Sequence, residues 1–264
     1  MAIPKKIHYC WFGGNELPKL AEKCIKSWKK YCKGYEIIRW DESNFDIESC
    51  PLYVRQAYDA KKWAFVTDYA RLKILYENGG VYFDTDVEVI KNIDKFLENQ
   101  CFMGIERADA CIKVATGLGI GCEKGFPLIK DIMDDYNGRT FVKDDGTFDI
   151  TTCTELNYAV LCKYGYVEEN RIQNVAGATI YPSEYFSPMD MGSGKIYKTK
   201  NTVSIHHYGL SWTTEEHRAE RKKYLRKAKR ADFIYNLKVL PNNILVKLLG
   251  KEGYESLKNK LKGK

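Results

Sequence analysis

The sequence lacks any long apolar run. Nowhere do ~18 consecutive apolar residues occur, so no segment has the length of a membrane-spanning helix. The first residues, MAIPKKIHYCWF, become charged after four positions and do not form the apolar stretch of a secretory signal. We therefore expect a soluble, cytoplasmic protein.

The cysteines lack the spacing of a metal site or a disulfide framework. Nine are present, an odd number, and no C-x-x-C pair occurs among them. In a chain of this size that pattern indicates reduced and mostly buried thiols, and it argues against structural zinc. Repeats and low-complexity linkers are also missing, and 44% hydrophobic residues in 264 are enough for one large core. We expect one domain with a modest appendage.

The positive charge is concentrated at the end of the chain. From residue 215 onward there are 15 Lys or Arg and 6 Asp or Glu, a net charge of +9, whereas the remaining residues carry −2. An apolar stripe at helical spacing runs through the same segment: Phe233, Leu237, Leu240, Ile244, Leu245, Leu248 and Leu249. The pattern predicts basic helices that either pack against a partner or lie on an anionic membrane surface. Nucleic-acid binding is disfavoured because aromatic residues are not interleaved as a stacking platform.

The first two thirds of the chain alternate between strand and helix patterns. KIHYCWF reads as a strand, the segment after Pro18 as a helix and YEIIRW as a second strand, an order typical of a parallel βαβ unit. A helix over residues 62–78 ends at Gly79-Gly80, and the strand VYF follows. We predict an α/β domain over residues 1–212 and a helical basic appendage over residues 213–264.

Two aspartates stand one residue apart in the segment GGVYFDTDVEVI. If the segment is extended, Asp84 and Asp86 point to one side, where their repulsion requires a cation or hydrogen-bond donors between them. A divalent ion completed by phosphate oxygens fits this pattern. The alternative is a turn in which the carboxylates cap backbone N–H groups.

Other polar and aromatic residues fall near this motif in the predicted fold. Asp68 and Arg71 share one face of an otherwise apolar helix, which indicates a buried pair with a partner or a task. Trp11 ends the first strand beside two glycines, either as a core residue or as a stacking surface for a flat base. In the late strand TVSIHHY only one of two histidines faces the site, and we favour His207 over His206 as a metal ligand.

Together these segments resemble family 32 glycosyltransferases, the group with a sugar-binding region containing a DXD motif. The resemblance is carried by IPKKIHYCWFGG, FVTDYARLKILYENGGVYFDTDVEV and IHHYGLSW, in that order. It also extends to the glucosyltransferase domain of large clostridial toxins. The resemblance implies a GT-A fold, Rossmann-like with a mixed and mostly parallel central sheet, a nucleotide-sugar donor, Mn²⁺ or Mg²⁺, and retention of anomeric configuration.

The resemblance also implies residue roles. Trp11 would stack on the base, Asp68 would accept hydrogen bonds from sugar hydroxyls, and Arg71 would contact the sugar or the diphosphate. Asp84 would bind ribose, sugar or metal-bound water, and Asp86 would ligate the metal. The late metal ligand would be His207, and Ser211 and Trp212 would bind the diphosphate. One departure concerns the segment TTCTELNYAVLCKYG, which lacks the Gly-Pro of many bacterial relatives near the acceptor.

We therefore predict a metal-dependent retaining hexosyltransferase that uses UDP-galactose or UDP-glucose. Its acceptor would be a saccharide or a lipid-linked saccharide in capsule or lipopolysaccharide synthesis, with the basic helices on the inner face of the plasma membrane. Glu106, Asp109 and Glu155 are the residues considered for positioning the acceptor. The alternatives are a metal-dependent phosphohydrolase or nuclease that uses Asp84, Asp86 and His207, and a carbohydrate-binding module without catalysis.

Overall fold

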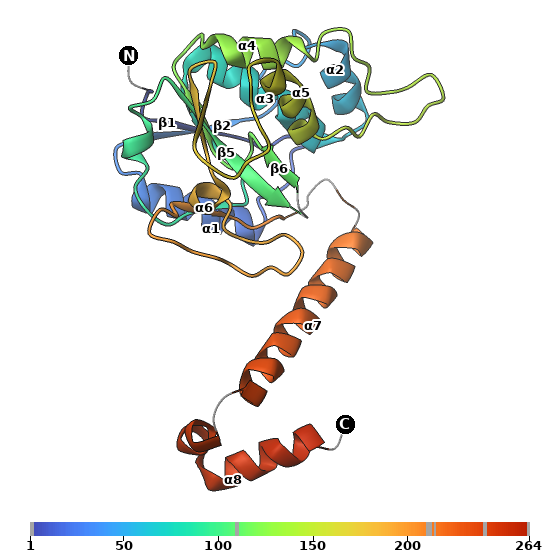
Figure 1. Ribbon diagram of the computed structural model, residues 1–264. Coiled ribbons are helices and arrows are strands. Elements are labelled where there is room, and N and C mark those ends of the chain that lie inside the picture. The colour runs from blue at the N-terminus through green and yellow to red at the C-terminus, as the bar shows by residue number, and fades with distance from the viewer. Residues whose placement is uncertain (1–2, 109–110, 210–212, 214, 240–241, 263–264) are drawn as a thin grey trace. The chain divides into compact units, whose positions relative to one another are not determined.

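Two units make up the chain, residues 1–212 and residues 213–264. The computed structural model describes residues 3–108, 111–209, 213, 215–239 and 242–262 (Figure 1). The two units are described separately below.

The first unit begins with the predicted βαβ arrangement. Strand β1 (Lys6–Cys10) is followed by helix α1 (Lys19–Tyr31) and strand β2 (Glu36–Trp40), and β1 and β2 are parallel. Helix α1 forms because its apolar residues recur at helical spacing, and Cys24, Ile25 and Trp28 are buried. On its other side β1 pairs in parallel with β3 (Gly80–Tyr82).

The central sheet has the strand order β2-β1-β3-β7-β5-β9-β8, with β6 paired to β5. The additional strands are β5 (Cys101–Ala108), β6 (Cys111–Val114), β7 (Ile120–Cys122), β8 (Gln173–Val175) and β9 (Ala178–Tyr181). The pairings place β2, β1, β3, β5 and β9 in one direction, and β6, β7 and β8 run the opposite way. This mixed, mostly parallel sheet confirms the predicted α/β fold class.

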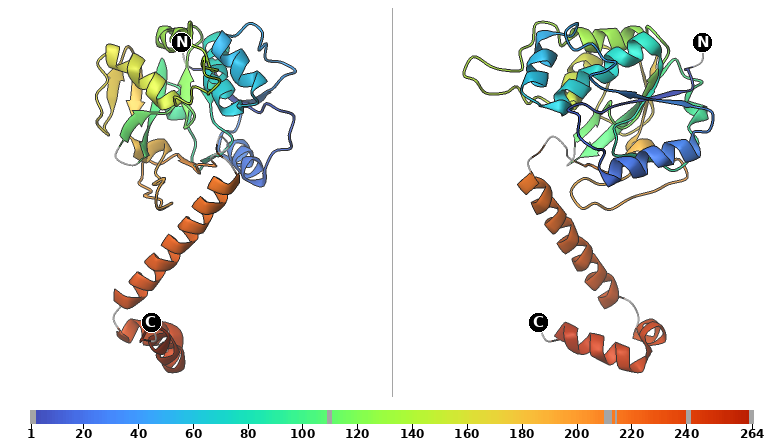
Figure 2. Two further views of the ribbon diagram at one scale, coloured as in Figure 1. Left: turned by 90° about the vertical axis from the view of Figure 1, so that its right-hand side faces the viewer. Right: turned by 180° about the vertical axis from the view of Figure 1, so that it is seen from behind.

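Helices cover both faces of the sheet (Figures 1 and 2). On one side lie α2 (Leu52–Asp59), α3 (Trp63–Asn78), α4 (Pro127–Asp134) and α5 (Cys153–Lys163), which share one apolar core with the sheet. On the other side α1 and α6 (Ser183–Phe186) contribute to a second core around Trp28, Phe96 and Phe186. A 3₁₀ turn, η1 (Asp94–Phe96), borders this core.

A second, two-stranded antiparallel sheet follows the DXD segment. It consists of β4 (Val87–Val89) and β10 (Ser204–His206), in the register His206 to Val87 and Ser204 to Val89. The sheet packs beside α1, where the Trp28 Nε1–H donates to the Val87 carbonyl over 2.8 Å. This pairing brings residues about 120 positions apart in the sequence to the end of β3.

The junction of α3 and β3 is held by a buried histidine. Gly79 ends the helix with φ = 65°, a conformation that favours glycine. The His8 Nδ1 accepts from the Trp40 Nε1–H (3.0 Å), so its Nε2–H donates to the Gly79 carbonyl (2.9 Å). Burial lowers the pKa of His8 to about 4, so it stays neutral. The start of β3, four residues before Asp84, is thereby fixed.

The second unit contains helices α7 (Glu215–Val239) and α8 (Asn242–Lys262). A break in helical geometry occurs at Gly250, where φ is 71°. Large apolar and aromatic side chains are exposed on both helices: Tyr224, Phe233, Tyr235, Ile244, Leu248 and Leu249. Within the described residues of the chain, no helix has the length and apolar character to cross a membrane.

Candidate active site

The DXD segment forms a turn between two sheets. β3 ends at Tyr82 and β4 begins at Val87, and the Val87 N–H donates to the Asp84 carbonyl over 3.0 Å. The expectation of an extended segment is wrong, and the backbone forms the turn that was its alternative. The two aspartates therefore do not alternate as in a strand, and each carboxylate has its own set of partners.

Arg71 on α3 lies between two acidic residues. Its Nη2 is 2.9 Å from Asp68 Oδ1 and 3.1 Å from Asp84 Oδ1, and its side chain is only 3% exposed. The other N–H groups donate to the Thr67 carbonyl (3.1 Å) and to Thr116 Oγ1 (3.3 Å). A buried cation is stable only with such partners. Protein atoms occupy the N–H groups of Arg71, so the arrangement favours a positioning role for this residue. Its direct contact with the nucleotide-sugar donor stays a prediction.

Asp68 is the less solvated of the two acidic partners. Burial raises the pKa of its carboxyl to about 6, although Arg71 acts in the opposite direction. The side chain keeps 15% of its surface exposed, so it is accessible to a small ligand group. A carboxyl group at the edge of a buried network is well suited to accept hydrogen bonds from hydroxyls.

Asp84 is fixed by several contacts, although 30% of its side chain stays exposed. Oδ1 accepts from the Tyr82 hydroxyl (3.1 Å) as well as from Arg71, and the backbone N–H donates to the Gly117 carbonyl (2.9 Å). A Cβ at position 117 would lie 1.9 Å from Asp84 Oδ2. The loop containing Gly117 therefore approaches the carboxylate as closely as only glycine permits.

Asp86 lies against His206 from strand β10. His206 Nε2 is 3.3 Å from Asp86 Oδ1, and the Gly209 N–H donates to Asp86 Oδ2 over 2.7 Å. Burial opposes ionisation of Asp86, but His206 and the Gly209 N–H outweigh it and lower the pKa of the carboxyl. Burial also opposes protonation of His206, but Asp86 and Glu106 outweigh it and raise its pKa.

His207 contacts a different group from His206, and its role as a metal ligand stays a prediction. Its Nε2 is 2.8 Å from Glu88 Oε2, and Lys23 Nζ lies 2.7 Å from the same oxygen. The preference for His207 depended on one side of the late strand being apolar and buried. Both Ser204 and Ile205 are buried, so the strand has no single interior face, and His206 is the histidine beside Asp86.

Trp11 lies at the same edge of the sheet as Asp84. It directly follows β1, which is parallel to β3, so both residues stand at the carboxyl ends of adjacent strands. The preceding Cys10 is buried and is a hydrogen-bond neighbour of Tyr82, and burial raises the pKa of its thiol to about 12. The Trp11 indole is partly exposed, and its Nε1–H donates to the Asn15 carbonyl over 2.7 Å. Base stacking by Trp11 stays a prediction.

The remaining predicted residues divide into two groups. Ser211, Trp212 and Asp109 lie outside the described residues. Glu155 is the N3 residue of a capping box with Thr152 at the start of α5, so its carboxylate has a structural partner. Glu106 lies on β5 with its Oε1 3.5 Å from His206 Nδ1, which places it at the site.

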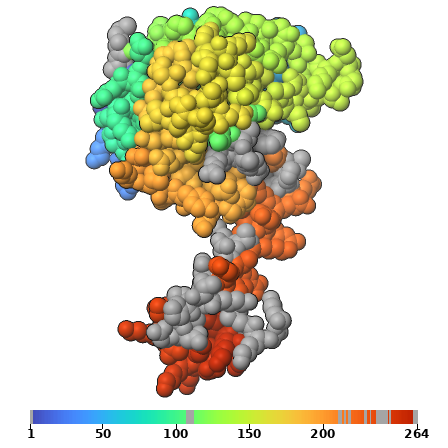
Figure 3. All heavy atoms as spheres, in the orientation of Figure 1, coloured from blue at the N-terminus to red at the C-terminus, as the bar shows by residue number. Residues whose placement is uncertain are grey.

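The segment between α4 and α5 projects from the surface of the first unit (Figure 3). The Gln56 side-chain oxygen accepts from the Phe141 and Val142 N–H groups, and the rings of Phe141 and Phe148 stack 5.1 Å apart. The segment leads into α5, whose first residue, Cys153, has its Sγ 3.8 Å from Arg71 Nη1. The projecting segment is therefore connected directly to the buried network.

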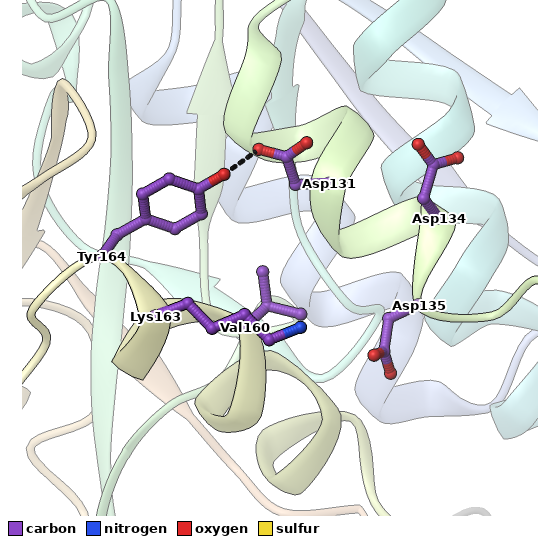
Figure 4. A pocket seen from close by; sticks show the side chains of 6 residues that line it. All are labelled: Asp131, Asp134, Asp135, Val160, Lys163 and Tyr164. Carbon is purple, nitrogen blue, oxygen red and sulfur yellow. Dashed lines mark hydrogen bonds between the residues drawn. The ribbon is translucent and has the colours of Figure 1, made fainter.

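A separate hollow of ≈ 320 Å³ lies between α4 and α5 (Figure 4). It is lined by Asp131, Asp134, Asp135, Val160, Lys163 and Tyr164, and the Tyr164 hydroxyl donates to Asp131 Oδ2 over 2.6 Å. None of the DXD residues lines it. The DXD residues are therefore separate from this hollow.

The Asp86–His206 pair has a geometry that suits a divalent cation. Two ligand atoms at ~2.1 Å from an octahedral ion and at right angles lie about 3.0 Å apart, close to the 3.3 Å between Oδ1 and Nε2. Among the described residues no group of three or more His, Cys, Asp and Glu forms a complete ligand cluster. The fit is thus to an ion that takes its other ligands from water or phosphate.

Sequence comparison places the DXD segment in a known family. Residues 18–103 match the family described as glycosyltransferase sugar-binding region containing DXD motif. The match covers about a third of the chain. It comprises α1 to β3, the DXD turn, β4 and the beginning of β5, and so contains Asp68, Arg71, Asp84 and Asp86. The predicted family is confirmed.

Curated relatives of the sugar-binding region are glycosyltransferases. An uncharacterized glycosyltransferase of Acanthamoeba polyphaga mimivirus is 34% identical over 108 residues, covering 36% of this chain and 40% of the relative. Inositol phosphoceramide mannosyltransferase 3 of Schizosaccharomyces pombe is 36% identical over 136 residues, covering 50% of this chain and 36% of the relative. The chain thus spans less than half the length of these curated relatives.

A solved structure is also similar to the chain. It is a glycosyltransferase involved in the glycosylation of the major capsid of PBCV-1, with 14% identity and a TM-score of 0.45, covering 83% of this chain and 98% of that one.

Several residues that surround Asp84 and Arg71 were not predicted from the sequence. The contacts of Tyr82, Thr116 and Gly117 with Asp84 and Arg71 were not predicted. The available signal was the glycine-rich segment TGLGIGC at residues 116–122, whose glycines permit close approach of the backbone. Of the nine cysteines, the eight whose side chains are described are free thiols, as predicted.

Proposed function

We propose that the chain is a metal-dependent retaining glycosyltransferase that moves a hexose from a nucleotide sugar to a saccharide or lipid-linked saccharide. The observation that carries this proposal is the arrangement of the two DXD aspartates within the matched sugar-binding region. Asp84 is held by a buried arginine, and Asp86 is held beside an imidazole at the carboxyl end of β3. Each acidic residue is thus fixed for a separate task.

In this proposal the residues of the chain bind and orient the donor. Trp11 stacks on the base, and Asp68 accepts hydrogen bonds from sugar hydroxyls at its partly exposed carboxyl group. Arg71 positions Asp68 and Asp84 from the interior. Asp86 and His206 hold Mn²⁺ or Mg²⁺, which would supply positive charge to the leaving diphosphate. UDP-galactose and UDP-glucose are the proposed donors.

The proposal is tested by release of the nucleoside diphosphate. The purified chain is incubated with a panel of UDP-, GDP- and ADP-sugars, with Mn²⁺ or with EDTA. We expect slow, metal-dependent release of a nucleoside diphosphate and free sugar from one donor without an acceptor, and loss of this release in Asp86→Asn. Asp131→Asn, which changes an acidic residue in the separate hollow, is the matched control and should retain the release.

Other products point to other functions. A phosphohydrolase or nuclease would release inorganic phosphate or a nucleoside monophosphate, or cleave nucleic acid. A carbohydrate-binding module would release no nucleotide from any donor. Either result contradicts the proposed transferase.

The proposal extends to peripheral association with the cytoplasmic face of an anionic membrane through residues 213–264. It is supported by the net charge of +9 from residue 215 onward and by the exposed Phe233 and Leu248 on α7 and α8. The full-length chain should co-sediment with vesicles containing phosphatidylglycerol and not with pure phosphatidylcholine vesicles. Phe233→Ser with Leu248→Ser should weaken the binding. Ile150→Ser, which removes an exposed apolar side chain from the first unit, should not.

A further inference from the structure

Glu106 faces the side of His206 that Asp86 does not occupy. His206 Nε2 is 3.3 Å from Asp86 Oδ1, and Nδ1 is 3.5 Å from Glu106 Oε1. The imidazole therefore lies between two carboxylates that come from different elements, the DXD turn and strand β5. These contacts define which ring nitrogen points toward the proposed metal position.

The contact with Glu106 is one that a buried imidazole requires. His206 Nδ1 is buried and has no hydrogen-bond partner among the described residues, and Glu106 Oε1 lies 3.5 Å from it. A buried N–H without a partner costs ~1–3 kcal/mol. A small movement of the Glu106 side chain, which is 18% exposed, would satisfy it.

The surroundings restrict the ring to this orientation. The ring of Tyr208 lies 4.2 Å from that of His206, and its hydroxyl is 2.9 Å from Ser187 Oγ. Tyr208 thus packs against the His206 ring from a side different from the two carboxylates.

We propose that Glu106 is a positioning residue for the metal site: it accepts the His206 Nδ1–H and so keeps Nε2 directed at the cation shared with Asp86. Histidine ligands commonly donate their second N–H to a carboxylate, which fixes the ring and increases the basicity of the ligating nitrogen. This inference rests on the proposed function in one respect, the binding of a divalent cation by Asp86 and His206.

Mn²⁺ affinity, measured on the full-length chain, tests the proposal. Free Mn²⁺ is followed by electron paramagnetic resonance during titration in the presence of UDP. Glu106→Ala and Glu106→Met should weaken Mn²⁺ binding about 10–100-fold. Glu106→Gln should restore most of the affinity, because its amide oxygen also accepts a hydrogen bond. Glu88→Ala removes the carboxylate beside the other histidine and is the matched control, with no expected loss.

A double-mutant cycle separates positioning from direct ligation. If Glu106 acts through His206, Glu106→Ala should cause no further loss in a His206→Ala background. Wild-type Mn²⁺ affinity in both Glu106→Ala and Glu106→Met overturns the proposal. A further loss of Mn²⁺ affinity in the double variant also overturns it, because Glu106 would then be a ligand itself. If the wild-type chain binds no Mn²⁺ with UDP, the proposed function and this inference both fall. Loss on His206→Ala without loss on Glu106→Ala overturns the inference alone.

Discussion

Replacing Gly117 with alanine should disturb the site by a small and well-defined steric change. The added Cβ would lie 1.9 Å from Asp84 Oδ2, 2.7 Å from its Cγ and 3.1 Å from Arg71 Nη1. The first two distances are far inside van der Waals contact, so the Asp84 carboxylate must rotate away. Its Oδ1 contacts with Arg71 and Tyr82, both 3.1 Å, would then be lost or lengthened.

The expected loss of stability is about 1–3 kcal/mol, the usual cost of overpacking. It should not reach the full cost of breaking a buried ion pair, because Asp68 still pairs with Arg71 at 2.9 Å. Urea denaturation measures this loss. The effect on donor binding should be larger than the effect on stability. A displaced Asp84 would abolish the Mn²⁺-dependent rise in melting temperature that the nucleotide sugar causes.

Gly121→Ala is the matched control for this prediction. A Cβ at Gly121 would lie 2.4 Å from Phe102 Cε1 in the core, so a similar loss of stability is expected. The atoms that this Cβ would meet belong to Phe102 and not to Asp84, so stabilisation by the nucleotide sugar should persist. Wild-type stability and wild-type donor binding in Gly117→Ala would refute the described position of Asp84.

Three further predictions follow from the same network. Arg71→Met should lower the free energy of unfolding in urea by about 3–5 kcal/mol, because it leaves two acidic residues without their buried cation. Lys73→Met on the same helix is the control and should lower it by under ~0.5 kcal/mol. Similar losses in the two variants would contradict the account. The folded-state pKa of Asp68, about 6, lies above its ordinary 3.8, so ionisation of this carboxyl destabilises the folded state. As the pH rises from 3.8 to about 6, the free energy of unfolding of wild type should fall by up to about 3 kcal/mol relative to Asp68→Asn. A difference that does not change with pH would exclude a raised pKa for Asp68. Trp11→Ala should weaken donor binding in calorimetry by about 5–150-fold, the value of one stacked base, ~1–3 kcal/mol; an unchanged affinity would show that Trp11 does not stack.

Local patterns were sufficient to predict the first half of the fold. The strand KIHYC, the helix around Cys24 and Trp28, and the parallel partner EIIRW have regular apolar spacing and short connections, so neighbours in sequence are neighbours in space. The same holds for α3 and β3, joined at Gly79. For this reason the sequence alone indicates that Asp68, Arg71 and Asp84 lie near one another.

The errors arose where distant segments decide the geometry. The turn at Asp84 to Asp86 forms because β4 leaves the main sheet to pair with β10, a partner more than 100 residues away. The placement of His206 and His207 depends on which side of β10 is buried, and both sides are. Strands β7 and β8 have three residues each, too few for a periodic pattern to indicate them.

The most direct test of the central claim is the position of the cation. Crystals of the full-length chain grown with Mn²⁺ and UDP would locate the ion by its anomalous scattering. The account predicts Mn²⁺ about 2–2.5 Å from an Asp86 oxygen and from His206 Nε2, with His207 still paired to Glu88. An ion held by His207, or no ion in the neighbourhood of Asp86, would contradict it.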